Sequence, residues 1–324
     1  MAKRKSTNDF AWPVSPAGYV LVDTVPAKGR AKSEPYLVAR TPKGPDLDHL
    51  SGAELFERCL SDVEKNAPRD YHPLQESGLF LKFAGLKVTA EAVAAFADDH
   101  GLLGGPLTQK VRIDLGSSRW SLARGERLAD WGSEITDMQH LVELWKAAKV
   151  GDPQPVEQYL TRAAKIWGGM MDDSTLNKEL LFRIRRAPNQ PGELADLMLK
   201  AVLQQKLRGR LSLVFSPPAH DALVPQPDSL LGALWLQFAQ AVIQNKQYRR
   251  CESCAEWFEI SPQVARAERV FCSTACRSRA YRQRRDEARR LNADGVPLEQ
   301  IARDLQSDAE TVSGWIKAKV APPE

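Results

Sequence analysis

The sequence predicts an α+β fold that is predominantly helical and has a small, basic C-terminal part. Several segments repeat apolar residues every three or four positions, and short stretches rich in β-branched residues interrupt them. Four of the five cysteines lie within residues 251–276. Because 43% of the 324 residues are hydrophobic, the chain can bury a sizeable core in roughly two domains with an appendage.

The first half of the chain mixes predicted strands and helices. Residues 1–45 combine a basic tail, several prolines and the stretch YVLVDTV, which predicts one or two strands. AELFERCLSDVEK has helical spacing, and Cys59 on its apolar stripe is interpreted as a buried hydrophobe rather than a nucleophile. LFLKFAGL predicts a strand, and TAEAVAAFADDHGLLGG predicts a helix with Thr89 as N-cap and Gly101 near its end.

From about residue 131 the pattern becomes mostly helical. Four segments predict amphipathic helices: ITDMQHLVELWKAAK, PVEQYLTRAAKIW, GELADLMLKAVLQQKL and SLLGALWLQFAQAVIQ. GRLSLVFSP predicts a strand between them. Residues 114–131 and the proline-rich VFSPPAHDALVPQPDSL predict loops.

Residues 1–245 give little sign of catalysis. The five histidines form no closely spaced ligand pair, and no phosphate-binding glycine loop, nucleophile elbow or His-Glu-x-x-His motif occurs. The acidic pairs Asp98–Asp99 and Asp172–Asp173 are interpreted as solvated faces or helix ends. We therefore expect no enzyme active site here, but a domain that senses an unidentified ligand or assembles subunits.

Two cysteine pairs predict a metal site in residues 246–292. Cys251 and Cys254 are separated by two residues, Cys272 and Cys276 by three, and 17 residues lie between the pairs. Four thiolates in two short pairs suit tetrahedral zinc. WFEI and RVF are expected to form a hairpin, and Ser273 to cap a helix that holds Cys276 in its first turn. Knuckle, hairpin and helix together predict a treble-clef-like finger.

A disulfide framework and a redox centre are the alternatives to a metal site. The N-terminus lacks the apolar run of a signal peptide, and no stretch is long and apolar enough for a membrane span, so a cytoplasmic location is expected. Disulfides do not persist in that compartment. A redox centre would leave the second pair unexplained, and iron is the alternative metal.

Arginines concentrate directly behind the cysteines. Residues 246–292 carry 12 basic and 6 acidic groups, although the net charge of the chain is only +4. On a helical wheel Tyr281, Ala288 and Leu291 share one face, and arginines spread over the other side. Arginine suits phosphate geometry, so these residues predict contacts to nucleic acid: Arg279, Arg282, Arg285, Arg289 and Arg290. For Arg249, Arg250 and Arg277 there are two interpretations: they contact nucleic acid, or they offset the negative charge of the thiolates.

Residues 293–324 predict a helix-turn-helix. Leu298, Ile301, Ala302 and Leu305 mark a first helix, and a short turn follows. Val312, Trp315 and Ile316 mark a second helix. Thr311 and Ser313 on that helix join the arginines as predicted nucleic-acid-binding residues. Asp308 and Glu310 open it with negative charge, and Ser307 with Glu310 fits a capping box. A helical hairpin used for dimerisation is the alternative.

Two resemblances accompany these motifs. SLLGALWLQFAQAVIQNKQYRRCESCAEWFE with VFCSTACRSRAYRQRR resembles the C-terminal part of bacterial CGNR-type zinc-finger proteins, which implies transcription regulation. The chain departs at Cys276-Arg-Ser-Arg279, where that family reads Cys-Gly-Asn-Arg, so a related treble clef is expected. Residues 301–315 are similar to the resolvase and invertase type of helix-turn-helix, but Gln306 stands where that motif has glycine.

Together these observations predict a bacterial, zinc-dependent DNA-binding protein, in particular a transcriptional regulator. Double-stranded DNA is the expected partner, and a homo-oligomer is also considered. One alternative is an RNA-binding or ribosome-associated zinc protein. The other is an enzyme or interaction domain, within residues 1–245, that is tethered to nucleic acid.

Overall fold

A computed structural model describes residues 10–24, 34–40, 68–116, 119–150, 191–215, 223–261 and 268–317. It contains both helices and antiparallel strands, which confirms the predicted α+β class. The chain divides into two compact units, residues 1–245 and 246–324. The predicted helices AELFERCLSDVEK, with Cys59, and PVEQYLTRAAKIW lie outside the described residues, as does the pair Asp172–Asp173. Among the described helices, none is both long and apolar enough to cross a bilayer.

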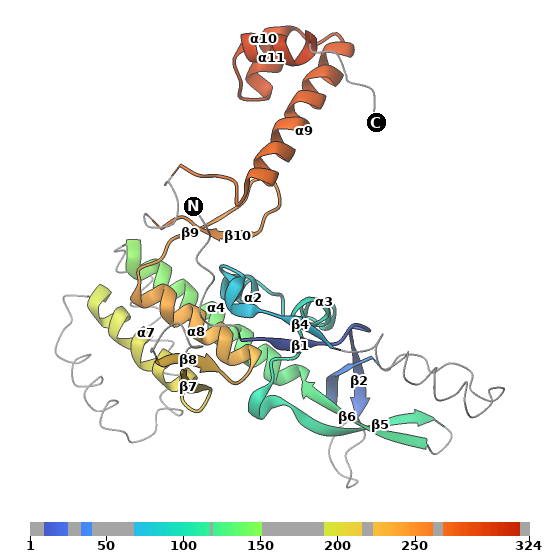
Figure 1. Ribbon diagram of the computed structural model, residues 1–324, viewed down its shortest axis with the longest axis vertical. Coiled ribbons are helices and arrows are strands. Elements are labelled where there is room, and N and C mark those ends of the chain that lie inside the picture. Colours follow the sequence, from blue (N-terminus) through green and yellow to red (C-terminus); the bar gives the residue numbers. More distant parts are fainter. Residues whose placement is uncertain are drawn as a thin grey trace. The chain divides into compact units, whose positions relative to one another are not determined.

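A four-stranded antiparallel sheet forms one side of the first unit (Figure 1). Its order is β2-β3-β6-β5, and its strands are β2 (Tyr19–Thr24), β3 (Glu34–Ala39), β5 (Gln109–Gly116) and β6 (Arg119–Arg127). β1 (Trp12–Val14) pairs separately with β4 (Arg69–Tyr71). The strand predicted at YVLVDTV is therefore confirmed, as β2.

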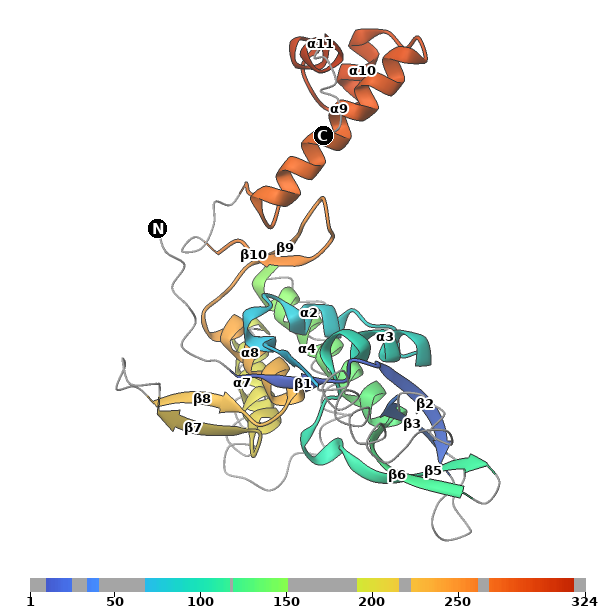
Figure 2. The same cartoon turned by 45° about the vertical axis from the view of Figure 1, so that its right-hand side comes forward.

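Helices pack around an aromatic core on the other side of this unit (Figure 2). They are α2 (Leu79–Ala84), α3 (Ala90–His100), α4 (Leu128–Val150), α7 (Pro191–Leu207) and α8 (Leu230–Ile243). α8 is almost wholly buried, and its Phe238 ring stacks on Phe80 of α2 with 5.1 Å between centroids. The predicted N-cap of α3 is confirmed, since the Thr89 side chain accepts a hydrogen bond from the Ala92 N–H.

Three predictions for this unit were wrong. LFLKFAGL forms helix α2 and not a strand. Every residue of α2 except Lys82 is buried, so this short apolar run has no clear period that would separate a helix from a strand. Residues 114–131 are not a loop, because QKVRIDLG and the segment after it pair as the β5–β6 hairpin. The proline-rich segment is not only a loop, because it contains strand β8 (Leu223–Pro227), which pairs with β7 (Leu211–Phe215). The strand predicted at GRLSLVFSP is confirmed, as β7.

One buried carboxylate ties the loop after α3 to the sheet. Glu126 is fully buried at the end of β6. Its oxygens accept hydrogen bonds from the backbone N–H groups of Leu103 (2.9 Å) and Gly104 (2.6 Å). The Thr108 hydroxyl (2.7 Å) and the Trp131 indole N–H (2.8 Å) complete the set. Burial raises the pKa of Glu126, and these donors oppose that shift by stabilising the carboxylate.

A second buried network joins α4, α7 and α8. Glu134 accepts hydrogen bonds from Lys206 (3.0 Å) and from the Trp235 indole N–H (3.1 Å). Lys206 also donates to Asp137 (2.6 Å), and Arg210 lies 3.5 Å from Glu134. Because these charges are shielded from water, each depends on its partners, and the network fixes how the three helices pack.

The described residues of the second unit form a short hairpin and three helices. β9 (Tyr248–Arg250) pairs with β10 (Trp257–Glu259), and α9 (Thr274–Ala293) is followed by α10 (Leu298–Asp304) and α11 (Ala309–Lys317). The strand at WFEI is confirmed, but the predicted pairing of WFEI with RVF is wrong. β10 pairs instead with the residues before Cys251, because a tight turn at Cys251–Cys254 brings β9 beside it.

We predict that Glu126→Gln destabilises the first unit by about 2–4 kcal/mol, because the amide offers one acceptor oxygen and turns an N–H group toward donors. Chemical unfolding followed by tryptophan fluorescence measures this cost. Glu91→Gln, at an exposed position of α3, is the matched control. Equal stabilities of the two variants would contradict the role given to Glu126.

Candidate functional site

Four cysteines of the second unit gather at one point. The sulfur atoms of Cys251, Cys254, Cys272 and Cys276 all lie within 4.8 Å of one another. The distance from Cys272 Sγ is 3.6 Å to Cys254 Sγ and 3.5 Å to Cys276 Sγ. These separations are far too long for a disulfide bond, and all four cysteines are free. The predicted ligand set is therefore brought together in space.

The arrangement fits a metal ion. Sulfur atoms at about 2.3 Å from a tetrahedrally coordinated ion lie about 3.8 Å from each other, close to the observed spacing. The Cys251–Cys254 turn is closed by two backbone hydrogen bonds, from Cys251 N–H to Glu256 O (2.9 Å) and from Ala255 N–H to Cys251 O (2.8 Å). Ala255 takes a left-handed conformation with φ of 59°, which returns the chain into β10. The four cysteines can hold one metal ion.

The thiols differ in their tendency to ionise. Burial raises the pKa of Cys251, but N–H donors from Cys272, Ser253 and Cys254 outweigh it and hold this pKa at about 6. Burial and the neighbouring thiols raise the pKa of Cys272 to about 12. Crowded sulfur atoms cannot all carry negative charge unless a cation lies among them, so a divalent ion is the natural partner of this cluster.

Arginines brace the loop that leads into Cys272. Arg269 donates hydrogen bonds to the carbonyl oxygens of Phe271 (2.7 Å) and Cys272, and its guanidinium lies 5.3 Å from the centre of the Phe258 ring. Arg249 donates in turn to the Arg269 carbonyl (3.2 Å). Arg249 and Arg269 thus fix the third cysteine by contacts to its backbone.

Helix α9 starts at the cysteine cluster. Ser273 is its N-cap and accepts a hydrogen bond from the Cys276 N–H (3.2 Å), as predicted. Cys276 is buried in the first turn, at the positive end of the helix dipole. The helix then continues beyond the finger for several turns, to Ala293 (Figure 1).

The residues predicted to bind nucleic acid have different surroundings. Arg279 and Arg282 are exposed and have no ion-pair partner within the described chain. Arg285 is bonded to Asp286 (3.0 Å). Arg289 is half-buried and donates to the Trp315 carbonyl (2.8 Å), which gives it a structural role.

Arg290 lies between two carboxylates, at 2.7 Å from Glu287 and 2.9 Å from Asp294. Two arginines that were not on the predicted list, Arg277 and Arg284, are exposed and resemble Arg279 and Arg282 in having no acidic partner among described residues. Their position on α9, close to the predicted arginines, is the sequence feature that could have identified them as candidate nucleic-acid-binding residues.

Charge is therefore divided along this unit. Residues 268–285 hold six arginines and a single acidic residue, Glu268. Residues 286–317 hold seven acidic and four basic residues. The N-terminal half of α9 forms a basic surface, defined by Arg277, Arg279, Arg282 and Arg284, whereas the region from Asp286 onward is acidic overall.

The predicted pair of helices packs on the far half of α9 (Figure 2). A small core of buried residues joins the three helices: Ala288, Ile301, Ala302, Val312 and Trp315. α10 and α11 are linked by a tight turn, as in a helix-turn-helix. Gln306 in this turn has φ of 50°, a left-handed conformation that glycine adopts without strain.

Asp308 rather than Ser307 caps α11. Its carboxylate accepts hydrogen bonds from the Thr311 N–H (2.7 Å) and the Thr311 hydroxyl (2.8 Å). The backbone N–H of Thr311 lowers the pKa of Asp308, as expected at a helix N-terminus. The predicted capping box of Ser307 and Glu310 was therefore wrong. Thr311 is engaged in this cap, while Ser313 is half-buried on the same helix.

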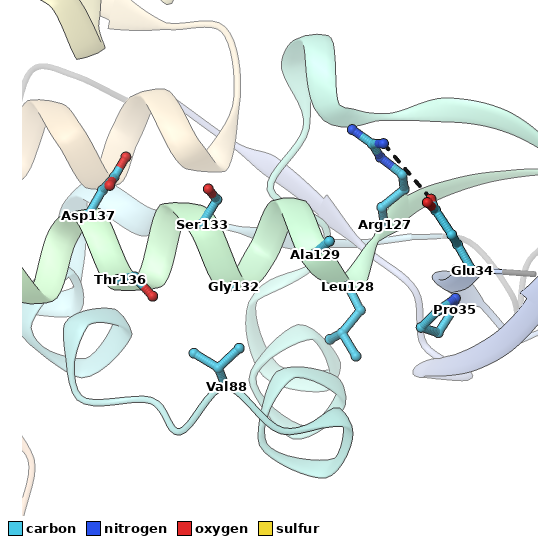
Figure 3. A pocket seen from close by; sticks show the side chains of 10 residues that line it. All are labelled: Glu34, Pro35, Val88, Arg127, Leu128, Ala129, Gly132, Ser133, Thr136 and Asp137. Carbon is cyan, nitrogen blue, oxygen red and sulfur yellow. Dashed lines mark ion pairs between the residues drawn. The ribbon is translucent and has the colours of Figure 1, made fainter. Parts of the chain in front are cut away.

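A pocket of about 720 Å³ lies on the first unit, beside the start of α4 (Figure 3). Its charged groups already have partners: Arg127 is bonded to Asp130 (2.8 Å) and lies 3.9 Å from Glu34, and Asp137 accepts from Lys206. In Figure 3, Asp137 and Ser133 point to one side of α4 and Thr136 to another. These side chains do not converge on a common point, so the pocket is not the candidate site.

The chain matches no protein-family model, no curated protein and no solved structure with which it was compared. The site itself defines a four-cysteine finger that can hold a metal ion and continues into a helix with a basic surface.

We predict one metal ion per chain, which Cys251→Ser abolishes, because a tetrahedral site that loses one thiolate cannot keep its affinity. Elemental analysis of purified protein gives the stoichiometry. Cys59→Ser, which changes the one cysteine outside residues 251–276, should retain the ion. Wild-type protein that lacks metal even when refolded with excess zinc would contradict the site.

We predict that Gln306→Gly stabilises the second unit by about 0.5–1 kcal/mol, because glycine relieves the left-handed strain at this turn. Thermal unfolding monitored by circular dichroism measures the gain. The same kind of change in a helix, Gln283→Gly in α9, should instead cost about 1 kcal/mol. Loss of stability in both variants would refute the strain assigned to Gln306.

Proposed function

We propose that this protein is a zinc-dependent nucleic-acid-binding protein that contacts duplex DNA through the basic half of α9. The single observation that carries the proposal is the set of four exposed arginines without acidic partners, on a helix that begins inside the four-cysteine site. Guanidinium groups suit phosphate oxygens, and a helix anchored at one end presents them in a fixed arrangement.

Zinc is the metal that the donor set favours. Four thiolates in a tetrahedral arrangement are typical of structural zinc sites, in which metal affinity is largely folding free energy. Residues Cys251, Cys254, Cys272 and Cys276 would hold the ion, and the ion would order the start of α9. Its role here is structural, because all four positions around it are filled by protein sulfur.

The helix-turn-helix supports DNA as the nucleic acid. α10 and α11 pack against α9 as the helices of a three-helix DNA-binding module do. However, Asp308 and Glu310 place negative charge in the first turn of α11, where base contacts normally start. We therefore assign most of the free energy of DNA binding to phosphate contacts of α9. Thr311 and Ser313 contribute at most a minor part of it.

A regulatory role for the whole chain is part of this proposal. The first unit has a tightly packed core and a pocket whose charged groups are already paired, which suits assembly or sensing more than catalysis. The resemblance to CGNR-type proteins points in the same direction. Structured RNA remains the main competing ligand for the same basic surface.

We predict that log K for duplex DNA falls with log[salt] with a slope between about −3 and −4, since four arginines each displace about one counterion. Arg282→Ala should weaken binding and make the slope shallower by about 1. Fluorescence anisotropy over a range of salt concentrations measures both quantities.

Arg290→Ala is the matched control, because Arg290 is already neutralised by Glu287 and Asp294. It should leave the slope unchanged. A salt-independent affinity for the wild type would rule out the proposed phosphate contacts, and tighter binding of structured RNA in competition would replace DNA as the substrate.

A further inference from the structure

Tyr281 is an exposed aromatic residue in the middle of the basic surface. It is 51% exposed and follows Cys276, the last of the four cysteines, by five residues on α9. Its ring makes an edge contact with Trp315, with 5.6 Å between centroids and 86° between planes. The Trp315 indole N–H donates a hydrogen bond to the Tyr281 hydroxyl (3.0 Å). The ring is thus held in one orientation.

An edge contact covers at most one face of the tyrosine ring. Trp315 is itself buried and is fixed from the other side by the small helical core. Tyr281 therefore presents a rigid aromatic surface to solvent at little further cost in conformational entropy. The contacts with Trp315 leave about half of the Tyr281 surface, 51%, open to solvent.

Arginines flank this ring on the same face of the helix. Arg277 precedes Tyr281 by four residues and Arg284 follows it by three, and residues at these spacings are neighbours on an α-helix. Both arginines are exposed, with no acidic partner in the described residues. A flat aromatic ring between two cations complements a nucleobase whose neighbouring phosphates are negative.

We propose that Tyr281 stacks on an unpaired nucleobase, so that the protein prefers single-stranded or locally opened nucleic acid to a closed duplex. The inference rests on the proposed function, because it uses the same basic surface. In a closed duplex the faces of the bases are covered by their neighbours, so an isolated aromatic side chain gains stacking only where a base is exposed. Arg277 and Arg284 bind the phosphates on either side of that base.

The test compares the full-length protein on a fluorescein-labelled single strand and on the duplex of the same sequence. Wild type should bind the single strand more tightly. Tyr281→Leu should reduce single-strand affinity about tenfold, the effect of losing one stacked base, without changing the salt slope. Affinity for the duplex should stay unchanged.

Two further variants separate stacking from folding. Tyr281→Phe keeps the ring and its edge contact with Trp315 and loses only the hydroxyl, so it should bind the single strand much more tightly than Tyr281→Leu does. Phe215→Leu removes an aromatic ring that is 79% exposed on the first unit and should have no effect on either affinity. Metal content and helical circular dichroism confirm that each variant is folded.

The outcomes distinguish this inference from the proposed function. Equal affinity of wild type and Tyr281→Leu for the single strand overturns stacking but leaves the arginine contacts in place. Tighter binding of the duplex than of the single strand by wild type also overturns it. A wild type that binds neither nucleic acid overturns the proposed function, and points to a protein partner for this surface.

Discussion

The four sulfur atoms within 4.8 Å of one another are the constraint on which the second unit depends. They join the turn at Cys251–Cys254, the residues just before Cys272 and the first turn of α9. The apolar core of this region is small, with only Phe258 and Ile260 buried beside the cysteines among the described residues. A metal ion bound by the cysteines would supplement this small core, because it would attract all four negative sulfurs at once. The direction of α9, and therefore the position of every arginine on it, follows from where Cys276 must lie.

The first unit achieves rigidity by different means. Its aromatic core is large enough to be stable, and two buried carboxylates add specificity to the packing. Glu126 is satisfied by four donors from one loop and one helix, and Glu134 by donors from α7 and α8. Each carboxylate would be costly without its donors, so a competing arrangement of these elements is disfavoured.

The sequence was most informative where a local signal decides the structure. Periodic stripes and capping residues such as Thr89 and Ser273 predicted helices, and cysteine spacing predicted the ligand cluster. The short, mostly apolar segment of α2 has no hydrophobic period that identifies it as a helix. By contrast, the alternation of polar and apolar residues in QKVRIDLG could have predicted strand β5. The Arg290 ion pairs could have been inferred from i+3 and i+4 spacing, whereas the contact from Arg289 to Trp315 joins residues far apart in the sequence.

The charge of a metal-bound cysteine cluster also affects how strongly each arginine attracts an anion. Four thiolates around a divalent cation leave a net charge of −2, so the arginines nearest the sulfurs are partly offset. Arg277, in the turn that follows Cys276, feels this field most. Arg282 and Arg284 lie one to two turns further along α9 and precede the acidic region that starts at Asp286. In the proposed function, an anionic ligand would therefore be held mainly over the middle of the helix, where Tyr281 is also placed.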